Sequence, residues 1–360
     1  MPGLSLVALV DFANARDVPL SETALLTAYV GLPWTFSFLW GPVIDNLRWP
    51  RLPRRAGWIF VMAAMGLVPL LMSAGVADVT ASIGSVATLF AVHSLFASVI
   101  DASTDALIIE MTPAAEVTRL HAWGRGGLLS GTAISTLVFA ALLPRMPFAV
   151  VAITLAALWA AAFIAAAVLY RSDWESVGMP TEIATETHQP NYVATLLQHL
   201  FSRRSLVTAA SFAAAYAVYT VLRLVTNYNV VQSVPEAAER FTQVRGLANL
   251  AVSVAMIFVA QLYLTKISIR RQSVWSAAIL VGFVVVAGGL LWTSSTSIAA
   301  IVVYAVALGL AKLMLYLTAC RHFATLAVPL TAGAQFTAYM AMLNIAEVVS
   351  AGALSWAGVG

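Results

Sequence analysis

Ten long apolar stretches decide what this chain can fold into. Each is about as long as the roughly 20 residues that an α-helix needs to cross a bilayer. Only 10% of the 360 residues are charged and 61% are hydrophobic, whereas about a quarter of an ordinary soluble domain is charged. Run length and composition therefore predict an all-α integral membrane protein. The stretches cover residues 22–45, 57–76, 82–109, 117–143, 147–170, 205–231, 243–264, 274–292, 297–320 and 332–358, and a shorter run at 3–14 looks like the end of one more helix.

The longest polar stretch, residues 171–204, falls near the middle of the chain. It predicts a linker between an N-terminal transmembrane bundle, 1–170, and a C-terminal transmembrane bundle, 205–360. Long helices that begin near Phe90 and Tyr304 each end at a proline. This likeness between the halves indicates an internal repeat, which is common among secondary transporters.

Positive charge alternates between successive loops. Because arginine and lysine accumulate in cytoplasmic loops, a bias of twelve against three predicts that the linker 171–204 is cytoplasmic, in a multi-pass protein of the inner (plasma) membrane. The excess of basic over acidic residues is small, and membrane topology explains where the basic residues lie. We therefore expect a lipid bilayer and no nucleic acid as partner. The twelve are Arg48, Arg51, Arg54, Arg55, Arg119, Arg171, Arg203, Arg204, Lys266, Arg270, Arg271 and Arg321, and the three are Arg16, Arg145 and Arg240.

Four of these arginines lie in one short segment, "GPVIDNLRWPRLPRRAGW", which starts at Gly41. It resembles the loop between helices 2 and 3 of the major facilitator superfamily, where a glycine and an aspartate precede an arginine cluster. Asn46 departs from that pattern, because an arginine is common at this position. With "DASTDALIIEMTPAAE", which starts at Asp101, the segment looks like the AmpG-like muropeptide permease / peptide–acetyl-coenzyme A transporter family.

This resemblance implies a major facilitator fold of two six-helix bundles. It also implies proton-coupled secondary active transport, by alternating access, of a small organic solute: a muropeptide, a peptide or an acyl-CoA-like anion. A twelve-helix design exceeds the runs found, so we interpret the chain as lacking most of helix 1 and all of helix 12. A genuine ten- or eleven-helix protein is the alternative.

The resemblance further implies a conformational latch formed by Gly41, Asp45, Arg54 and Arg55. An aspartate at a helix C-terminus is unfavourable against the helix dipole, so Asp45 needs a cationic partner. Such a cluster can hold two halves together in one conformation and release them in another. The simpler alternative is that the arginines only fix the loop in the cytoplasm.

Ionisable residues inside the spans are costly and mark functional sites. Asp101 and Asp105 are four residues apart and share a helix face, so their mutual repulsion would favour protonation of one of them. Arg125 on the following antiparallel helix is a plausible partner for Asp101. These three residues form a candidate proton-coupling group, with a static ion pair as the alternative.

A polar stripe on the helix at 205–231 predicts a substrate site. Its members share a face at 100° per residue and suit a wet cavity for an anionic or sugar-bearing ligand. The superfamily resemblance places helices 1, 4, 7 and 10 around that cavity. The alternative is that the cations of this site pair with Glu347 and Asp11 in structural bridges. The candidate substrate-binding residues are Tyr216, Tyr219, Arg223 and Asn227, with Lys312 and Tyr316 from the helix at 297–320.

Several motifs are absent from the sequence. There is no phosphate-binding glycine-rich loop before a lysine, no H-E-x-x-H and no cysteine–histidine cluster, which are the usual signs of nucleotide and metal sites. We therefore expect no cofactor, no metal and no enzymatic activity, and a monomer. A siderophore uptake permease of the same superfamily, a membrane-embedded enzyme and a non-transporting receptor remain the alternative functions.

Overall fold

The computed structural model describes residues 7–40, 43–44, 49, 54–111, 114–174, 192–233, 238–259, 262–263, 266–293, 297–326 and 332–357. Their regular structure is helical, which confirms the predicted all-α fold class. In chain order the helices are α1 (Leu9–Asn14), α2 (Leu20–Thr35), the 3-10 turn η2 (Ser37–Leu39), α4 (Arg54–Ser73), α5 (Ile83–Met111), α6 (Ala114–Leu142), α7 (Phe148–Trp174), α8 (Tyr192–Leu200), α9 (Arg203–Ser233), α10 (Ala238–Val259), α11 (Ile269–Thr293), α12 (Ile298–Leu326) and α13 (Ala332–Trp356).

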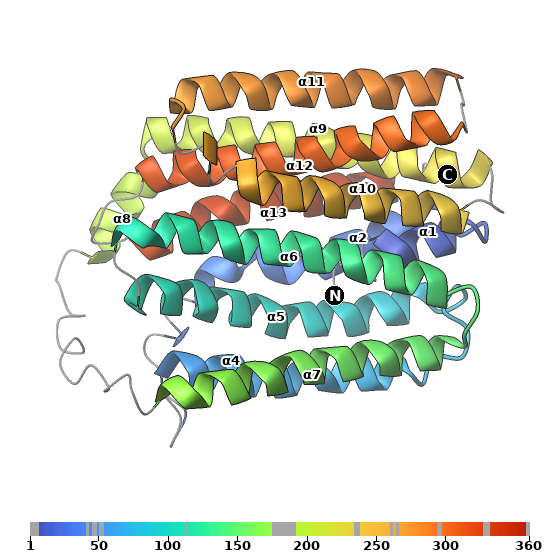
Figure 1. Cartoon of the computed structure of the whole chain (residues 1–360), viewed down its shortest axis with the longest axis horizontal. Coiled ribbons are helices and arrows are strands. Elements are labelled where there is room, and N and C mark those ends of the chain that lie inside the picture. The colour runs from blue at the N-terminus through green and yellow to red at the C-terminus, as the bar shows by residue number, and fades with distance from the viewer. Residues whose placement is uncertain are drawn as a thin grey trace.

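The long helices lie side by side, with their axes along the long dimension of the molecule (Figure 1). Helices up to α7 occupy one part of the bundle and helices from α9 onward the other; below, these are the N-terminal and C-terminal halves. Helices α4 and α7 form one margin and α11 forms the opposite one. The short helix α8 lies at the end of the bundle where α9 begins, which we call the linker side.

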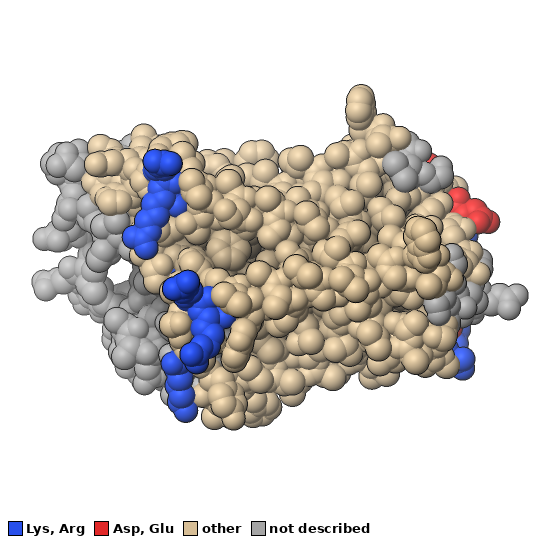
Figure 2. Space-filling view, turned by 90° about the horizontal axis from the view of Figure 1, so that it is seen from above, with Lys and Arg blue, Asp and Glu red and all other residues tan. Residues whose placement is uncertain are grey.

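Eight of the described helices are long and apolar enough to cross a membrane. Their outward faces carry large apolar side chains: Leu169 is 71% exposed and Val285 is 68% exposed. Figure 2 shows the middle of one face free of charged residues, with Lys, Arg, Asp and Glu towards the two ends. An apolar belt between charged ends is what a multi-pass membrane protein presents to lipid.

Each half has its own apolar core. Leu70, Phe90 and Phe139 are fully buried in the N-terminal half, where α4, α5 and α6 meet. Phe283 and Phe323 are fully buried in the C-terminal half. Each half therefore has apolar packing of its own.

Two helix pairs make the most extensive contacts between the halves: α2 packs on α13, and α6 packs on α10. At the second pair the backbones approach closely. A side-chain carbon at Gly246 would lie 2.9 Å from Leu137 of α6, and one at Gly126 would collide with Ile257 of α10. Glycine lets helices come this near without displacing a neighbour.

Two differences between the helices and the predicted runs affect the residues discussed below. The run 22–45 is divided, because α2 ends at Thr35, two residues after Pro33, and η2 follows. Proline has no amide hydrogen and interrupts the helical ladder. Helix α10 begins at Ala238 rather than at 243, so Arg245 lies two turns inside a helix instead of at its start.

Candidate functional site

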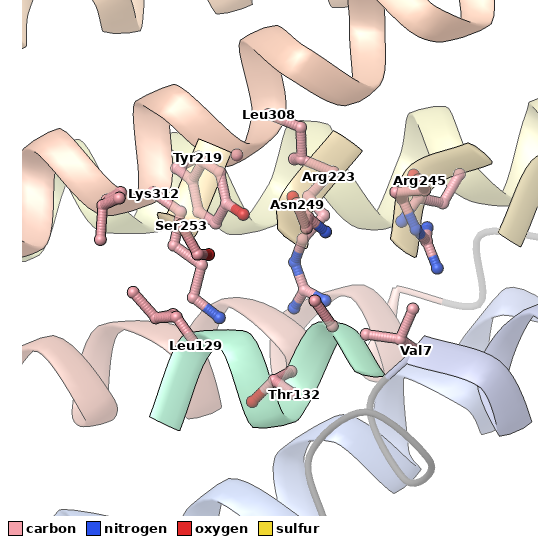
Figure 3. Close-up of a pocket in the computed structure, with 14 residues that line it drawn as sticks. Val7, Leu129, Thr132, Tyr219, Arg223, Arg245, Asn249, Ser253, Leu308 and Lys312 are labelled. Carbon is pink, nitrogen blue, oxygen red and sulfur yellow. The ribbon is translucent and has the colours of Figure 1, made fainter. Parts of the chain in front are cut away.

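A small cavity lies between the halves, bordered by α6, α9, α10 and α12 (Figure 3). Its volume is about 60 Å³. That space holds a few water molecules, whereas sites for organic ligands enclose roughly 300–1,000 Å³. The conformation is therefore closed around this central cavity, and an organic solute would enter only after helices separate. The lining residues are Val7, Leu129, Thr132, Ala133, Tyr219, Arg223, Asn227, Arg245, Asn249, Ser253, Leu308, Gly309, Lys312 and Leu313.

Helix α9 turns three polar side chains to this cavity: Tyr219, Arg223 and Asn227. They are four residues apart and therefore lie above one another on one face. All three are buried. The hydroxyl of Tyr304 on α12 donates to Asn227 Oδ1 at 2.7 Å, which fixes the amide. Tyr216, one turn earlier, packs its ring on Tyr219 with 5.6 Å between centroids but does not line the cavity.

Arg223 is partly neutralised. Its guanidinium donates to Glu347 Oε1 of α13 at 3.0 Å, while the buried Nε of the same side chain has no acceptor among the described atoms. Figure 3 shows the guanidinium directed into the space towards Thr132. Arg223 thus keeps donor capacity for a further acceptor in the cavity.

Lys312 of α12 also points into the cavity (Figure 3). It is half-buried, and within the described part of the chain its ammonium has no ion-pair partner. The carboxylate of Glu347, which acts on Lys312 electrostatically, is bound to Arg223. An ammonium inside a membrane protein without a counter-ion is unfavourable, so a bound anion would be stabilised here.

The third cation of the cavity, Arg245 of α10, is paired across the halves. Its guanidinium binds Asp11 Oδ2 of α1, and the hydroxyl of Thr242 donates to the same oxygen at 2.6 Å. Asp11 and Arg245 are each no more than 2% exposed. A buried pair of this kind is strongly destabilised when one partner is removed, so the contact ties α1 to α10 firmly.

An open vestibule lies beyond this pair, on the side of the molecule away from the linker. It has a volume of about 450 Å³ and is lined by residues of α1, α6 and α10, including Phe12, Arg16 and Thr242. At its edge Arg145 binds Glu239 at 2.7 Å. Arg245 lines the central cavity and Thr242 lines the vestibule. Asp11, Thr242 and Arg245, called the Asp11 cluster below, therefore separate the two spaces.

Sequence reasoning missed Arg245, Asn249 and Ser253. The signal was present, since the three are spaced by four residues and share one face of α10. Arg245 was overlooked because the predicted run began only two residues before it. Thr132 was missed as well, because a lone threonine in an apolar run carries no distinctive pattern.

The structure brings together only some of the predicted site residues. Of the six substrate candidates, Tyr219, Arg223, Asn227 and Lys312 line the cavity, whereas Tyr216 and Tyr316 do not. The helices around it also differ from the expected set, because α6 and α10 contribute described lining residues and α5, the fourth span, contributes none. Helix α6 borders the cavity because it packs closely on α10.

The other predicted groups are only partly placed. Asp101 is half-buried on α5. The structure does not describe Gly41 and Asp45, nor the side chains of Asp105, Arg125, Arg54 and Arg55. The proton-coupling group and the latch therefore stay predictions. Among the described residues, no group of three His, Cys, Asp or Glu side chains is placed to hold a metal ion.

Comparison with known proteins agrees with this architecture. Residues 3–351 match the sequence profile of the Major Facilitator Superfamily. The fold is similar to that of the nucleoside transporter NupG, with a TM-score of 0.66 and 12% identity over 99% of this chain and 87% of that one.

Two other solved structures are similar. One is the peptide transporter POT, with a TM-score of 0.59 and 10% identity over 98% of this chain and 90% of that one. The other is the xylose transporter XylE from E. coli in a partially occluded inward-open conformation, with a TM-score of 0.57 and 13% identity over 99% and 92%. At these identities the likeness shows the fold, and it confirms the two-bundle fold class implied by the sequence.

Proposed function

The chain belongs to the Major Facilitator Superfamily, and from this premise we propose that it carries an organic anion across the membrane. Secondary transport in a multi-pass membrane protein is the activity that the family supports. Family membership sets the membrane-embedded enzyme aside. The substrate class is the proposal, and it rests on the charges of the central cavity.

The observation that carries the proposal is the ammonium of Lys312 in the cavity wall. The cavity has three cations, Arg223, Arg245 and Lys312, against two carboxylates bound to them, Glu347 and Asp11. One negative charge on a solute would balance this set. Tyr219, Asn249 and Ser253 would supply hydrogen bonds that fix the orientation of the rest of the solute, as polar groups do in ligand pockets.

Arg223 extends the same site. The free Nε of Arg223 on α9 and the ammonium of Lys312 on the neighbouring helix α12 suit a carboxylate or phosphate that bridges the two cations. A charge-assisted hydrogen bond contributes roughly twice as much as a neutral one. Glu347 would then compete with the solute for Arg223, so binding of the anion loosens the contact between α9 and α13.

Finer features of the function are proposed from the sequence alone. We propose that Asp101, Asp105 and Arg125 couple transport to protons and that Gly41, Asp45, Arg54 and Arg55 latch the halves. The AmpG-like resemblance favours a muropeptide, a peptide or an acyl-CoA-like anion. We further propose a monomer in the inner membrane with the linker in the cytoplasm.

Uptake into proteoliposomes under an imposed proton gradient tests the proposal. The panel holds an anhydro-muropeptide, a small peptide, acetyl-CoA, an iron siderophore and a neutral sugar, each with wild type and Lys312→Gln. We expect gradient-dependent uptake of an anionic member that falls roughly tenfold or more in the variant. Uptake of the neutral sugar alone, equal in both proteins, would contradict an anionic substrate.

Silence from the whole panel would favour the receptor alternative, provided that the protein is folded. A thermal-shift scan of the same compounds separates the cases, because a ligand that binds only the native state raises the unfolding temperature whether or not it is transported.

A further inference from the structure

Gly309 lies in the wall of the central cavity, inside the long helix α12. A glycine inside a helix is less favourable than an alanine, so its presence there needs a reason. A side-chain carbon at Gly309 would lie 2.7 Å from Oδ1 of Asn249 on α10, which is too close. The next atoms, Cβ and Cγ1 of Val252, would be 3.5 Å away, at an ordinary van der Waals distance.

This environment differs from that of the glycines at helix contacts. A carbon at Gly126 would collide with the side chain of Ile257, and one at Gly246 would press on Leu137. Those glycines let two helices approach each other. Among the described atoms around Gly309, only the end of one polar side chain lies nearer than 3.5 Å. The space left by the missing methyl group therefore holds the amide of Asn249.

The amide of Asn249 has its oxygen against α12. That oxygen faces Gly309, whose Cα offers only weak C–H contacts. The amide nitrogen carries two N–H donors, and no residue that the structure describes accepts a hydrogen bond from it. Because Asn249 lines the cavity, these donors are available to a solute.

Two cations line the cavity together with this amide. Lys312 follows Gly309 by three residues and shares its face of α12, where such positions are roughly 5–6 Å apart. Figure 3 shows Lys312, Asn249 and Arg223 around the same space. An ammonium, a guanidinium and an amide NH₂ group all donate hydrogen bonds. An ionised carboxylate or phosphate accepts from all three, whereas the hydroxyl of a neutral solute offers no charge to the cations.

We propose that Gly309 determines the specificity of the substrate site by positioning the amide of Asn249. With glycine on α12, the amide keeps its oxygen against that helix and its N–H groups for the solute, so the site selects an oxyanion over a neutral hydroxyl group. Alanine would displace the amide, with little effect on the packing of α10 against α12. The inference rests on the proposed function, because it requires that an anionic solute occupies the central cavity.

Charged and neutral thiol reagents test the site directly, whatever its natural substrate is. Ser253→Cys in a Cys320→Ser background puts a single thiol in the cavity wall, one turn after Asn249. The full-length protein is treated with anionic 2-sulfonatoethyl methanethiosulfonate or with neutral 2-hydroxyethyl methanethiosulfonate. The anion preference is the ratio of the two labelling rates, divided by the same ratio for free 2-mercaptoethanol. We expect a preference of roughly tenfold or more in this parent protein.

Gly309→Ala should lower the anion preference roughly threefold. Asn249→Ala should lower it by a similar factor, and Gly309→Ala should have no further effect in the Asn249→Ala background, because the glycine acts through the amide. Gly309→Ala should unfold at the same temperature as the parent or a higher one. The matched control is Gly282→Ala on α11, where an added carbon meets nothing within 4 Å, and it should keep the full preference.

Lys312→Gln separates this inference from the proposed function. No preference in the parent, a preference that Lys312→Gln leaves unchanged, or a thiol that reacts with neither reagent in the folded protein would overturn both. A preference that falls in Lys312→Gln but not in Gly309→Ala would overturn the role of Gly309 alone. A further loss when Gly309→Ala is added to Asn249→Ala would do the same. Instability of Gly309→Ala would also overturn it, because the glycine would then serve helix packing.

Discussion

Lys312 carries a charge that the closed conformation leaves without a partner among the described residues. Burying an ammonium is costly unless an opposite charge or hydrogen bonds compensate it. Arg223 and Arg245 line the same cavity and each binds a carboxylate. A bound anion would offset this cost at Lys312, so substitution of this residue is a sensitive test of the proposed site.

Lys312→Met should separate stability from function. Methionine has a similar length and no charge, so we expect the substrate-free protein to unfold at a temperature roughly 2–4 °C higher. Uptake of the anionic solute should fall roughly tenfold or more, and Lys312→Arg should retain much of it. A methionine variant that is less stable and still transports would show that the lysine is structural.

Asp11 should respond in the opposite way. In Asp11→Asn the guanidinium of Arg245 is left buried without its counter-charge, and we expect the free energy of unfolding to fall by about 3–5 kcal/mol. Thr242→Val removes only one hydrogen bond to the same carboxylate and should lose about 1 kcal/mol. Thermal unfolding in nanodiscs measures both.

The double variant Asp11→Asn/Arg245→Gln checks the cause. It removes both charges, so it should recover most of the stability lost in Asp11→Asn. If the double variant is as unstable as the single one, the pair is not the source of the effect.

Residue spacing predicted part of this site and missed the rest for a physical reason. The four-residue period of Tyr219, Arg223 and Asn227 shows that they share a face, and the structure places that face on the cavity. Spacing does not say which helix lies opposite. The pairing of Arg245 with Asp11 joins residues 234 positions apart in the chain, and it depends on how α1 and α10 are packed.

At the level of elements, helix types and approximate bounds were predictable because spans are long and apolar. The contacts between spans were not. A glycine-rich run from Gly124 to Gly131 lies at the middle of α6, and such runs allow close helix packing, yet of its glycines only Gly126 meets a neighbour. Side-chain carbons at Gly124, Gly127 and Gly131 would have nothing within 4 Å. Composition shows that a helix can be approached closely, whereas the rotation of the helix decides which glycine is used.

Gly126→Ala and Gly127→Ala form a matched pair that tests the α6–α10 contact. The added methyl at Gly126 runs into Ile257, and overpacking of this kind costs about 1–3 kcal/mol. At Gly127 the methyl meets nothing, and alanine favours the helix by up to about 1 kcal/mol. We expect the first variant to unfold at a lower temperature than wild type and the second at the same or a higher one. Equal unfolding temperatures would show that α6 and α10 are not in close contact.

Across the whole molecule, the central cavity is closed, while the vestibule is open at one end. The vestibule reaches the Asp11 cluster from one side, and the close α6–α10 contact lies further along the same helices towards the linker side. Alternating access requires that one half moves against the other around a central site. The contact between Gly126 and Ile257 should therefore break in every transport cycle that opens the linker side.

A reversible crosslink at this contact tests that motion. A side-chain carbon at Gly126 would lie 3.9 Å from Cβ of Ile257, within the range of roughly 3.5–4.5 Å that disulfides span. Gly126→Cys/Ile257→Cys, made in a Cys320→Ser background so that no other thiol is present, should therefore crosslink on oxidation. We expect uptake to stop in proportion to the crosslinked fraction and to return on reduction. Gly126→Cys alone, treated with the same oxidant, should keep transporting, because a single thiol cannot join the helices. Full uptake by a completely crosslinked protein would mean that α6 and α10 stay together throughout the cycle, and the motion would then have to occur at other contacts between the halves.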